Sequence, residues 1–220
     1  MILKVNKHSK DLIIGVLGFR SDFIIKALDY YNLKWSLFDP NNPHPCDLII
    51  GSGVYNILPD HIISLPTFGT YIIHETPLPE GRGHAPIQWT LSNNRSNFCL
   101  SLFKASKGID DGLIVYQHNI AIDDYDSCED LERKRGEGIT KCILIFLKEV
   151  IDGVIVLREQ TGRSSYYKKR TPKDSCIDHI IDPKKLWGAL RLCDNIKYPA
   201  YITINGCKIY IKYYKDNDNK

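Results

Sequence analysis

Short apolar runs alternate with a helical pattern in the first third of the chain. Apolar runs at 11–18, 46–53 and 69–74 each end near a glycine or a histidine, and segment 21–31 repeats its apolar residues with the period of a helix. Buried parallel strands are typically continuous apolar runs, and helices between them form the crossover connections. The pattern therefore predicts an α/β fold with a parallel or mixed sheet.

The pattern changes after the first hundred residues. Two extended segments, 98–106 and 112–122, are followed by a long helical pattern that Asp126 or Ser127 could cap. A further extended run at 154–160 follows this helix. We expect these segments to complete the sheet and to cover it.

The C-terminal part has a different character. Residues 161–175 are polar and rich in turn formers, so we expect a linker or flap there. Further on, Asn205 and Gly206 stand between alternating β-formers, which strongly indicates a type I′ hairpin. We expect a core of residues 1–157 and a small α+β subdomain of residues 158–220 that ends in this hairpin. Its edge strand could pair with a second copy to form a homodimer.

Composition and charge exclude several classes of protein. With 220 residues, 43% hydrophobic and 25% charged, the chain is ordinary for a globular protein. A net charge of +3 is too mild to argue for a nucleic-acid partner, and charges interrupt the most apolar stretch, so we expect no membrane insertion. The seven cysteines contain no C-x-x-C pair, which favours free thiols in a reducing cytoplasm over disulfides or a metal site.

The first candidate for chemistry is His74, at the end of an apolar run. Pro77 and Pro79 stiffen the loop that follows, and Arg82 lies between two glycines, placed to tie the loop down or to contact an anion. Ligands of open α/β sheets bind at the carboxyl ends of the strands. A lone histidine is often a structural hydrogen-bonding residue, but this loop favours a site.

The second candidate is Asp110, which stands with Asp111 between two glycines. Paired aspartates beside glycine are most often a simple turn. If Asp110 faces His74, its carboxylate would favour the charged imidazole and fix the orientation of the ring. The residues alone leave both interpretations open.

Together these motifs resemble the formyltransferase family that uses N10-formyltetrahydrofolate. In that family a histidine is followed by S/T-L-L-P, then R-G-x-x-P, and later D-x-G; residues 74–86 and 110–112 are similar to this pattern. The resemblance extends from about 11 to 157 and implies a Rossmann-like core. It also implies that His74 and Asp110 are catalytic, with His74 stabilising negative charge or moving a proton.

The resemblance further implies where ligands bind, without a metal. The expected cofactor is N10-formyltetrahydrofolate, held largely by backbone groups. Its expected contacts are Gly53, Tyr55, Asn56, Leu58, Lys107 and Gly108. The expected substrate contacts are Thr76, Arg82, Gln88, Tyr166 and Tyr167.

The C-terminal segment is similar to family members that formylate amino sugars on nucleotide carriers for surface polysaccharides. Members acting on methionyl-tRNA usually carry a larger, basic C-terminal barrel. The resemblance thus implies an N-formyltransferase whose partner is a nucleotide-linked amino sugar. Two alternatives remain open: a non-catalytic formyltransferase-like binding protein, and a folate-dependent enzyme acting on another amine.

One position departs from the family pattern. The family's catalytic asparagine lies two residues before the histidine, and this chain has Ile72 there. Loss of one such oxyanion donor typically costs about a hundred- to a thousand-fold in rate. Gln88 and backbone N–H groups are the expected substitutes, and the non-catalytic alternative rests on this departure.

Overall fold

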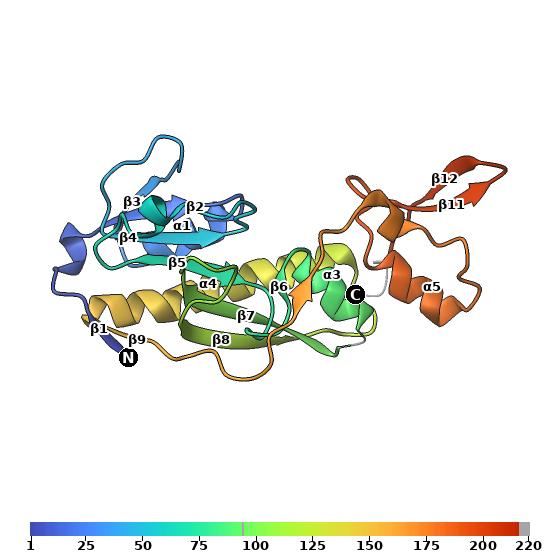
Figure 1. Cartoon of the computed structure of the whole chain (residues 1–220). Coiled ribbons are helices and arrows are strands. Elements are labelled where there is room, and N and C mark those ends of the chain that lie inside the picture. The colour runs from blue at the N-terminus through green and yellow to red at the C-terminus, as the bar shows by residue number, and fades with distance from the viewer. Residues whose placement is uncertain (94, 216–220) are drawn as a thin grey trace.

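The computed structural model describes residues 1–93 and 95–215, and its body is a six-stranded mixed sheet (Figure 1). From one edge to the other, the strands are β3 (Lys34–Leu37), β2 (Ile13–Leu17), β4 (Leu48–Ser52), β5 (Thr70–His74), β7 (Asn97–Lys104) and β8 (Ile114–Ala121). The first four run parallel, and the β5–β7 and β7–β8 pairs are antiparallel. The predicted α/β fold with a mixed sheet is confirmed.

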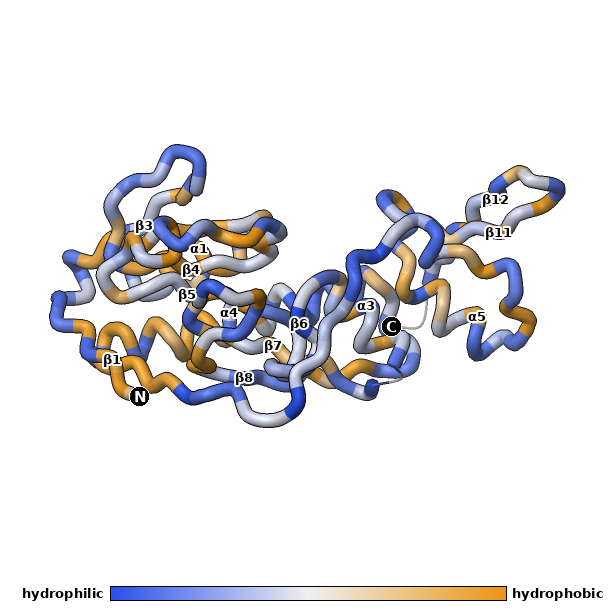
Figure 2. The backbone as a smooth tube through the Cα atoms, in the orientation of Figure 1, coloured by the Kyte–Doolittle hydropathy of each residue, from blue (hydrophilic) through white to orange (hydrophobic). Residues whose placement is uncertain are grey.

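Two helices, α1 (Ser21–Tyr30) and α4 (Cys128–Ile151), pack together against one face of the sheet. This face holds the main core, and the tube in Figure 2 is correspondingly apolar along β2 and β4. The opposite face carries smaller apolar clusters, one of them beside the short helix α2 (Asp60–Ile63). Residues of both clusters, among them Leu58 and Phe103, line a pocket at the ends of the strands.

The long helix α4 begins after Ser127, one of the two caps that the sequence suggested. The Ser127 hydroxyl accepts from the Asp130 N–H, and the Asp130 carboxylate accepts from the Ser127 N–H at 2.9 Å, so both form a capping box. Beyond it, Leu131 and Ile139 lie on the buried stripe of the helix, and Arg135 lies between them with 3% of its surface exposed. An arginine on the core face of a helix needs a polar partner nearby.

Two strand pairings join segments that the sequence pattern did not connect. β1 (Ile2–Lys4) pairs antiparallel with β9 (Val154–Val156), and β10 (Tyr166–Tyr167) pairs in parallel with β6 (Arg82–Gly83). The expected flap at 161–175 is therefore ordered in part against the loop that follows His74. Helix α3 (Pro86–Ser92) starts directly after this loop, and 3-10 turns cover Ser9–Asp11 and Pro172–Ser175.

The C-terminal part lies at one end of the molecule (Figure 1). It contains α5 (Pro183–Leu190) and the antiparallel strands β11 (Ala200–Ile204) and β12 (Cys207–Ile211), with a small apolar cluster of its own. Asn205 and Gly206 have φ of 48° and 80°, as a type I′ turn requires, so the predicted hairpin is confirmed. The domain boundary and the homodimer stay predictions, and residues 216–220 of the expected subdomain lie outside the described residues.

All seven cysteines are free, as expected. Among the helices of the described ranges, none has the length and apolar character needed to cross a membrane. The same ranges contain no group of three or more His, Cys, Asp or Glu side chains arranged to hold a metal ion.

Candidate active site

The carboxyl ends of β2, β4 and β5 meet at one edge of the sheet and form a pocket there. β5 ends at His74, β4 leads into Gly53, and the turn after β2 carries Arg20; all three residues line the pocket. Gly18 makes this turn with φ of 98°, and a Cβ there would lie 2.2 Å from the Ser52 carbonyl oxygen. Only glycine allows the two strand ends to approach so closely.

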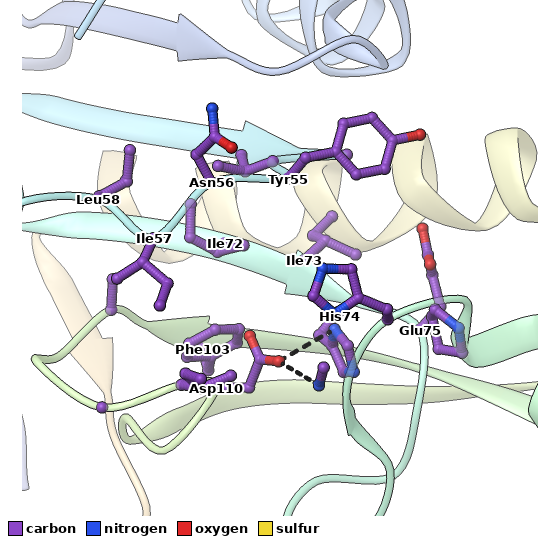
Figure 3. A pocket seen from close by; sticks show the side chains of 18 of the residues that line it. Tyr55, Asn56, Ile57, Leu58, Ile72, Ile73, His74, Glu75, Phe103 and Asp110 are labelled. Carbon is purple, nitrogen blue, oxygen red and sulfur yellow. Dashed lines mark hydrogen bonds and ion pairs between the residues drawn. The ribbon is translucent and has the colours of Figure 1, made fainter. Parts of the chain in front are cut away.

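His74 and Asp110 face each other in this pocket (Figure 3). The His74 Nδ1 lies 3.6 Å from an Asp110 carboxylate oxygen, and the same oxygen accepts from the Gly83 N–H at 2.9 Å. The His74 Nε2 lies 2.9 Å from the Gly81 carbonyl oxygen. Because a carbonyl can only accept, Nε2 carries a proton, and Nδ1 is the ring atom that remains for acid–base chemistry.

A single glutamine connects the loops that hold this pair. The Gln160 amide nitrogen donates to the carbonyl oxygens of Asp110 and Gly112, both at 2.8 Å, and its oxygen accepts from Arg82 at 2.7 Å. Asp110 has φ of 49°, which is unusual for a residue with a side chain. We call these three bonds the Gln160 clamp; they fix the aspartate's backbone and tie it to the loop after His74.

The expected cofactor contacts gather at the pocket with one exception. Gly53, Tyr55, Asn56, Leu58 and Gly108 line it, although the Asn56 amide points away from His74 and Asp110 in Figure 3. The exception, Lys107, is not among the described residues of the lining. Its ammonium pairs with the exposed Asp60 at 2.8 Å.

The expected substrate contacts divide into two groups. Tyr166 and Tyr167 line the pocket, brought there by the pairing of β10 with β6. Thr76, Arg82 and Gln88 are not among the described lining residues. Thr76 is buried, Gln88 lies on α3, and Arg82 binds Gln160 and the Tyr166 hydroxyl, so Arg82 ties the loop down.

Ile72 lies on the same side of β5 as His74 and lines the pocket. It packs against an apolar cluster of Leu78, Phe103 and Ile114. This end of the pocket is therefore apolar at the position where an amide was expected from the family pattern. Gln88, the expected substitute, is not in the described lining.

At the other end of the pocket lies a charged cluster that the sequence analysis missed. Arg20 approaches Glu75 at 3.7 Å and Glu132 at 3.6 Å, and Arg135 lies 3.8 Å from Glu75 and in direct contact with Glu132. Burial lowers the pKa of Arg20, although Glu75 and Tyr55 each act to raise this pKa. Burial also lowers the pKa of Arg135, to about 10. We call these four residues the Arg–Glu cluster.

One signal in the sequence points to part of this cluster. Arg135 is spaced by four residues from both Leu131 and Ile139, so it falls on the apolar stripe of its helix. No comparable signal marks Arg20, which follows a tight turn.

The chain resembles known proteins over most of its length. Residues 37–144 match the family described as formyl transferase. A methionyl-tRNA formyltransferase of Thermotoga maritima is 31% identical over 150 residues, which are 68% of this chain and 48% of that protein. The chain thus spans about half the length of this curated relative.

Solved structures share the fold. A sugar N-formyltransferase from Shewanella sp. FDAARGOS_354 superposes with a TM-score of 0.74 at 14% identity, over 93% of this chain and 98% of that one. HypX from Aquifex aeolicus, in complex with tetrahydrofolic acid, superposes with a TM-score of 0.75 at 18% identity, over 92% of this chain and 37% of that one. The matched segment, residues 37–144, carries His74, Asp110 and the loop between them, so this part of the chain belongs to the formyl transferase family.

Proposed function

We propose that this protein is an N-formyltransferase that uses N10-formyltetrahydrofolate and formylates the amine of a nucleotide-linked amino sugar. The observation that carries the transferase assignment is the His74–Asp110 pair, held in a pocket at the strand ends of a formyl transferase domain. We place the reaction in the cytoplasm, within surface-polysaccharide biosynthesis.

The residues of the pocket fit the folate. A pterin is a flat ring with apolar faces and a polar edge, and the apolar end offers Ile57, Leu58, Ile72, Phe103 and Ile109 beside the backbone of two loops. Pockets for such rings are mostly apolar, with a few polar groups that fix orientation. When bound, N10-formyltetrahydrofolate supplies the formyl carbon that the acceptor amine attacks.

His74 performs the proton chemistry in this proposal. The amine must lose a proton as it forms the new bond, and Nδ1 of His74 is the ring atom free to take it. Asp110, at 3.6 Å, stabilises the imidazolium that results. With Ile72 in place of an amide, this cation also has to stabilise the negative charge that develops nearby.

The non-catalytic alternative rests on Ile72 alone. Against it stands the Gln160 clamp, which holds Asp110 in a left-handed conformation beside His74. Backbone strain of this kind is typical of functional sites. Together with the facing His74, it supports a working site over an idle one.

The nucleotide sugar is supported by the segment that crosses the pocket. Tyr166 is 62% exposed at the pocket wall and is available to stack on a base. Lys168 and Arg170 follow it and flank Trp89, at 5.4 and 5.9 Å from its ring, so this side could meet a diphosphate. Methionyl-tRNA is the second candidate acceptor, because the Thermotoga maritima relative is named for it.

Two measurements test the proposal. Isothermal titration with 5-formyltetrahydrofolate, which does not transfer its formyl group, should give saturable binding. Incubation with N10-formyltetrahydrofolate and each of several dTDP- and UDP-linked amino sugars, or methionyl-tRNA, should add a formyl group to one acceptor, read by mass spectrometry. Folate binding without transfer to any amine supports the binding-protein alternative, and absence of folate binding overturns the proposed function.

A further inference from the structure

The Arg–Glu cluster closes the end of the pocket that lies opposite its apolar wall. Glu75 directly follows His74, and Arg20 lies on the turn after β2; both line the pocket. In Figure 3 the Glu75 carboxylate and the Tyr55 hydroxyl are at one end of the pocket, and Ile57, Leu58 and Phe103 are at the other. His74 lies between these ends, where an acceptor amine would have to be.

The Glu75 carboxylate lines the pocket without a hydrogen-bond donor among the described residues. It is 7% exposed, and its nearest cations, Arg20 and Arg135, are 3.7 and 3.8 Å away, beyond hydrogen-bond distance. No described residue donates a hydrogen bond to its side chain. Behind it, the Nε of Arg135 is buried without a partner. The Glu75 oxygens themselves remain accessible from the pocket, so a polar group of a ligand placed there can donate the hydrogen bonds that no described residue supplies.

Stacking on Phe19 orients both Tyr55 and Arg20 at this end of the pocket. The Phe19 and Tyr55 rings stack at 4.9 Å between centroids with 4° between their planes, and the Arg20 guanidinium lies 3.9 Å from the Phe19 ring centroid. An arginine stacked in this way keeps its planar set of donors in one orientation. The end of the pocket is thus preorganised to donate hydrogen bonds.

The charge of the cluster selects the kind of group. Two arginines and two glutamates cancel, so a ligand with a net charge would leave one charge unpaired in a buried place. A neutral group with a donor and an acceptor side by side satisfies both residues: Arg20 donates to its oxygen, and Glu75 accepts from its O–H or N–H. Neighbouring hydroxyls or an amide have this chemistry, whereas the thioether chain of methionine has one weak acceptor and no donor.

We propose that Arg20 and Glu75 form the acceptor subsite, which binds hydroxyl or amide substituents next to the reactive amine. The inference rests on the proposed function and deepens it, since it favours a sugar over a methionyl group as the acceptor. Glu75 and Arg20 act on the acceptor's affinity; the folate binds at the apolar end.

The test measures the steady-state constants of Glu75→Gln and Arg20→Lys with N10-formyltetrahydrofolate. The probes are a dTDP-linked 4-amino-4-deoxy sugar, its analogue lacking the hydroxyl next to the amine, and methionyl-tRNA. Glu75→Gln should raise KM for the sugar by about 10- to 100-fold, the range for a lost hydrogen bond to a charged group, and leave KM for the folate within about threefold. The analogue should lose affinity against the wild type and much less against Glu75→Gln, because its missing hydroxyl is the one that Glu75 binds.

Glu129→Gln is the matched control. It removes one carboxylate charge from the same helix as Glu132, but Glu129 is exposed, does not belong to the Arg–Glu cluster and is not among the described lining residues. Its KM for the sugar should stay within about threefold of the wild type. If Glu75→Gln does not fold, the same KM values are measured for Arg20→Lys, which keeps the charge.

Each outcome is decisive. Transfer to methionyl-tRNA and not to the sugar, or equal KM values for wild type, Glu75→Gln and Arg20→Lys, overturns the subsite. Binding of 5-formyltetrahydrofolate with no transfer to the sugar also overturns it while leaving the folate pocket intact. Failure of the wild type to bind 5-formyltetrahydrofolate overturns the proposed function itself, and the subsite with it.

Discussion

The two ends of the pocket are built on different physical principles. The apolar end is shaped by Ile72, Phe103 and neighbouring side chains, whose attraction for a ligand has little directional preference. The charged end depends on Arg20 and Glu75, whose interactions are directional and are costly when one partner is missing. The first end can accept any flat apolar ring of suitable size, and the second discriminates between substituents. The apolar end therefore contributes affinity for a flat ring, and the charged end contributes specificity for substituents, with His74 between the two ends.

The largest effect is expected from removing the residue between the two ends. His74→Ala should lower kcat by about a hundred- to ten-thousand-fold, the range for loss of a positioned acid–base group. Binding of 5-formyltetrahydrofolate, measured by titration, should change by less than about threefold, because the apolar end is intact. Full activity in this variant would exclude His74 from the chemistry.

Placing an amide in the apolar end should bring it closer to the family pattern. Ile72→Asn is expected to raise kcat by about 10- to 100-fold, less than the full effect of an oxyanion donor because the packing against Leu78 and Phe103 is lost. Ile72→Val, which loses packing without adding a donor, is the control and should not raise kcat. An unchanged kcat in Ile72→Asn would mean that another donor already acts at this place.

Breaking the Gln160 clamp should lower the rate of the reaction without weakening binding at either end of the pocket. Gln160→Glu keeps the shape but replaces two N–H donors by a carboxylate oxygen, so kcat should fall by about 10-fold or more, with KM for the folate within about threefold. Hydrogen–deuterium exchange should rise in peptides covering 106–113. Glu159→Gln, a charge change of the same size and opposite sign at the exposed neighbour, should alter neither reading. A change in KM with constant kcat would assign the glutamine to binding.

The smallest effect concerns the capped first turn of α4, the helix that carries two members of the Arg–Glu cluster in its following turn. Burial acts to raise the pKa of Asp130, but hydrogen bonds from Lys215 and Ser127 outweigh it and hold this pKa well below its usual range. A lowered carboxylate pKa stabilises the fold above the unfolded-state value of about 4, and this contribution is lost as the pH falls below it.

Asp130→Asn should therefore lower the free energy of unfolding by about 1 kcal/mol near pH 7, and by less near pH 3, as measured by urea titration. Glu129→Gln removes the same charge from the same turn but none of the cap's bonds, and should have little effect at either pH. Equal losses at both pH values would show that the carboxylate's charge is unimportant there.

The sequence predicts most of the sheet because its signals are local. The apolar runs at 11–18, 46–53 and 69–74 correspond to β2, β4 and β5, and Ser127 is one of the two caps that the pattern suggested for α4. The short pairings of β1 with β9 and of β10 with β6 could not be predicted, because strands of two or three residues have no period.

The residues of the site likewise fall into a predictable group and an unpredictable one. His74 and Asp110 lie in motifs, so the spacing of the motifs suggests that they meet. Arg20, Glu75 and Arg135 come from three distant segments, and charged residues are ordinarily placed on the surface. Their meeting is a consequence of tertiary packing, and in the sequence only the place of Arg135 on an apolar stripe hints at it.

The Gln160 clamp has a consequence for how such a protein can be recombined. Residue 160 lies past the end of the segment that matches the family, yet its bonds fix the aspartate and the arginine inside that segment. A chimera joined at position 157 would inherit both members of the His74–Asp110 pair and lose the part that aligns them. Exchange of C-terminal segments between relatives should give an active protein only when the junction lies beyond Tyr167. A chimera joined earlier can keep the fold and still lose a working site.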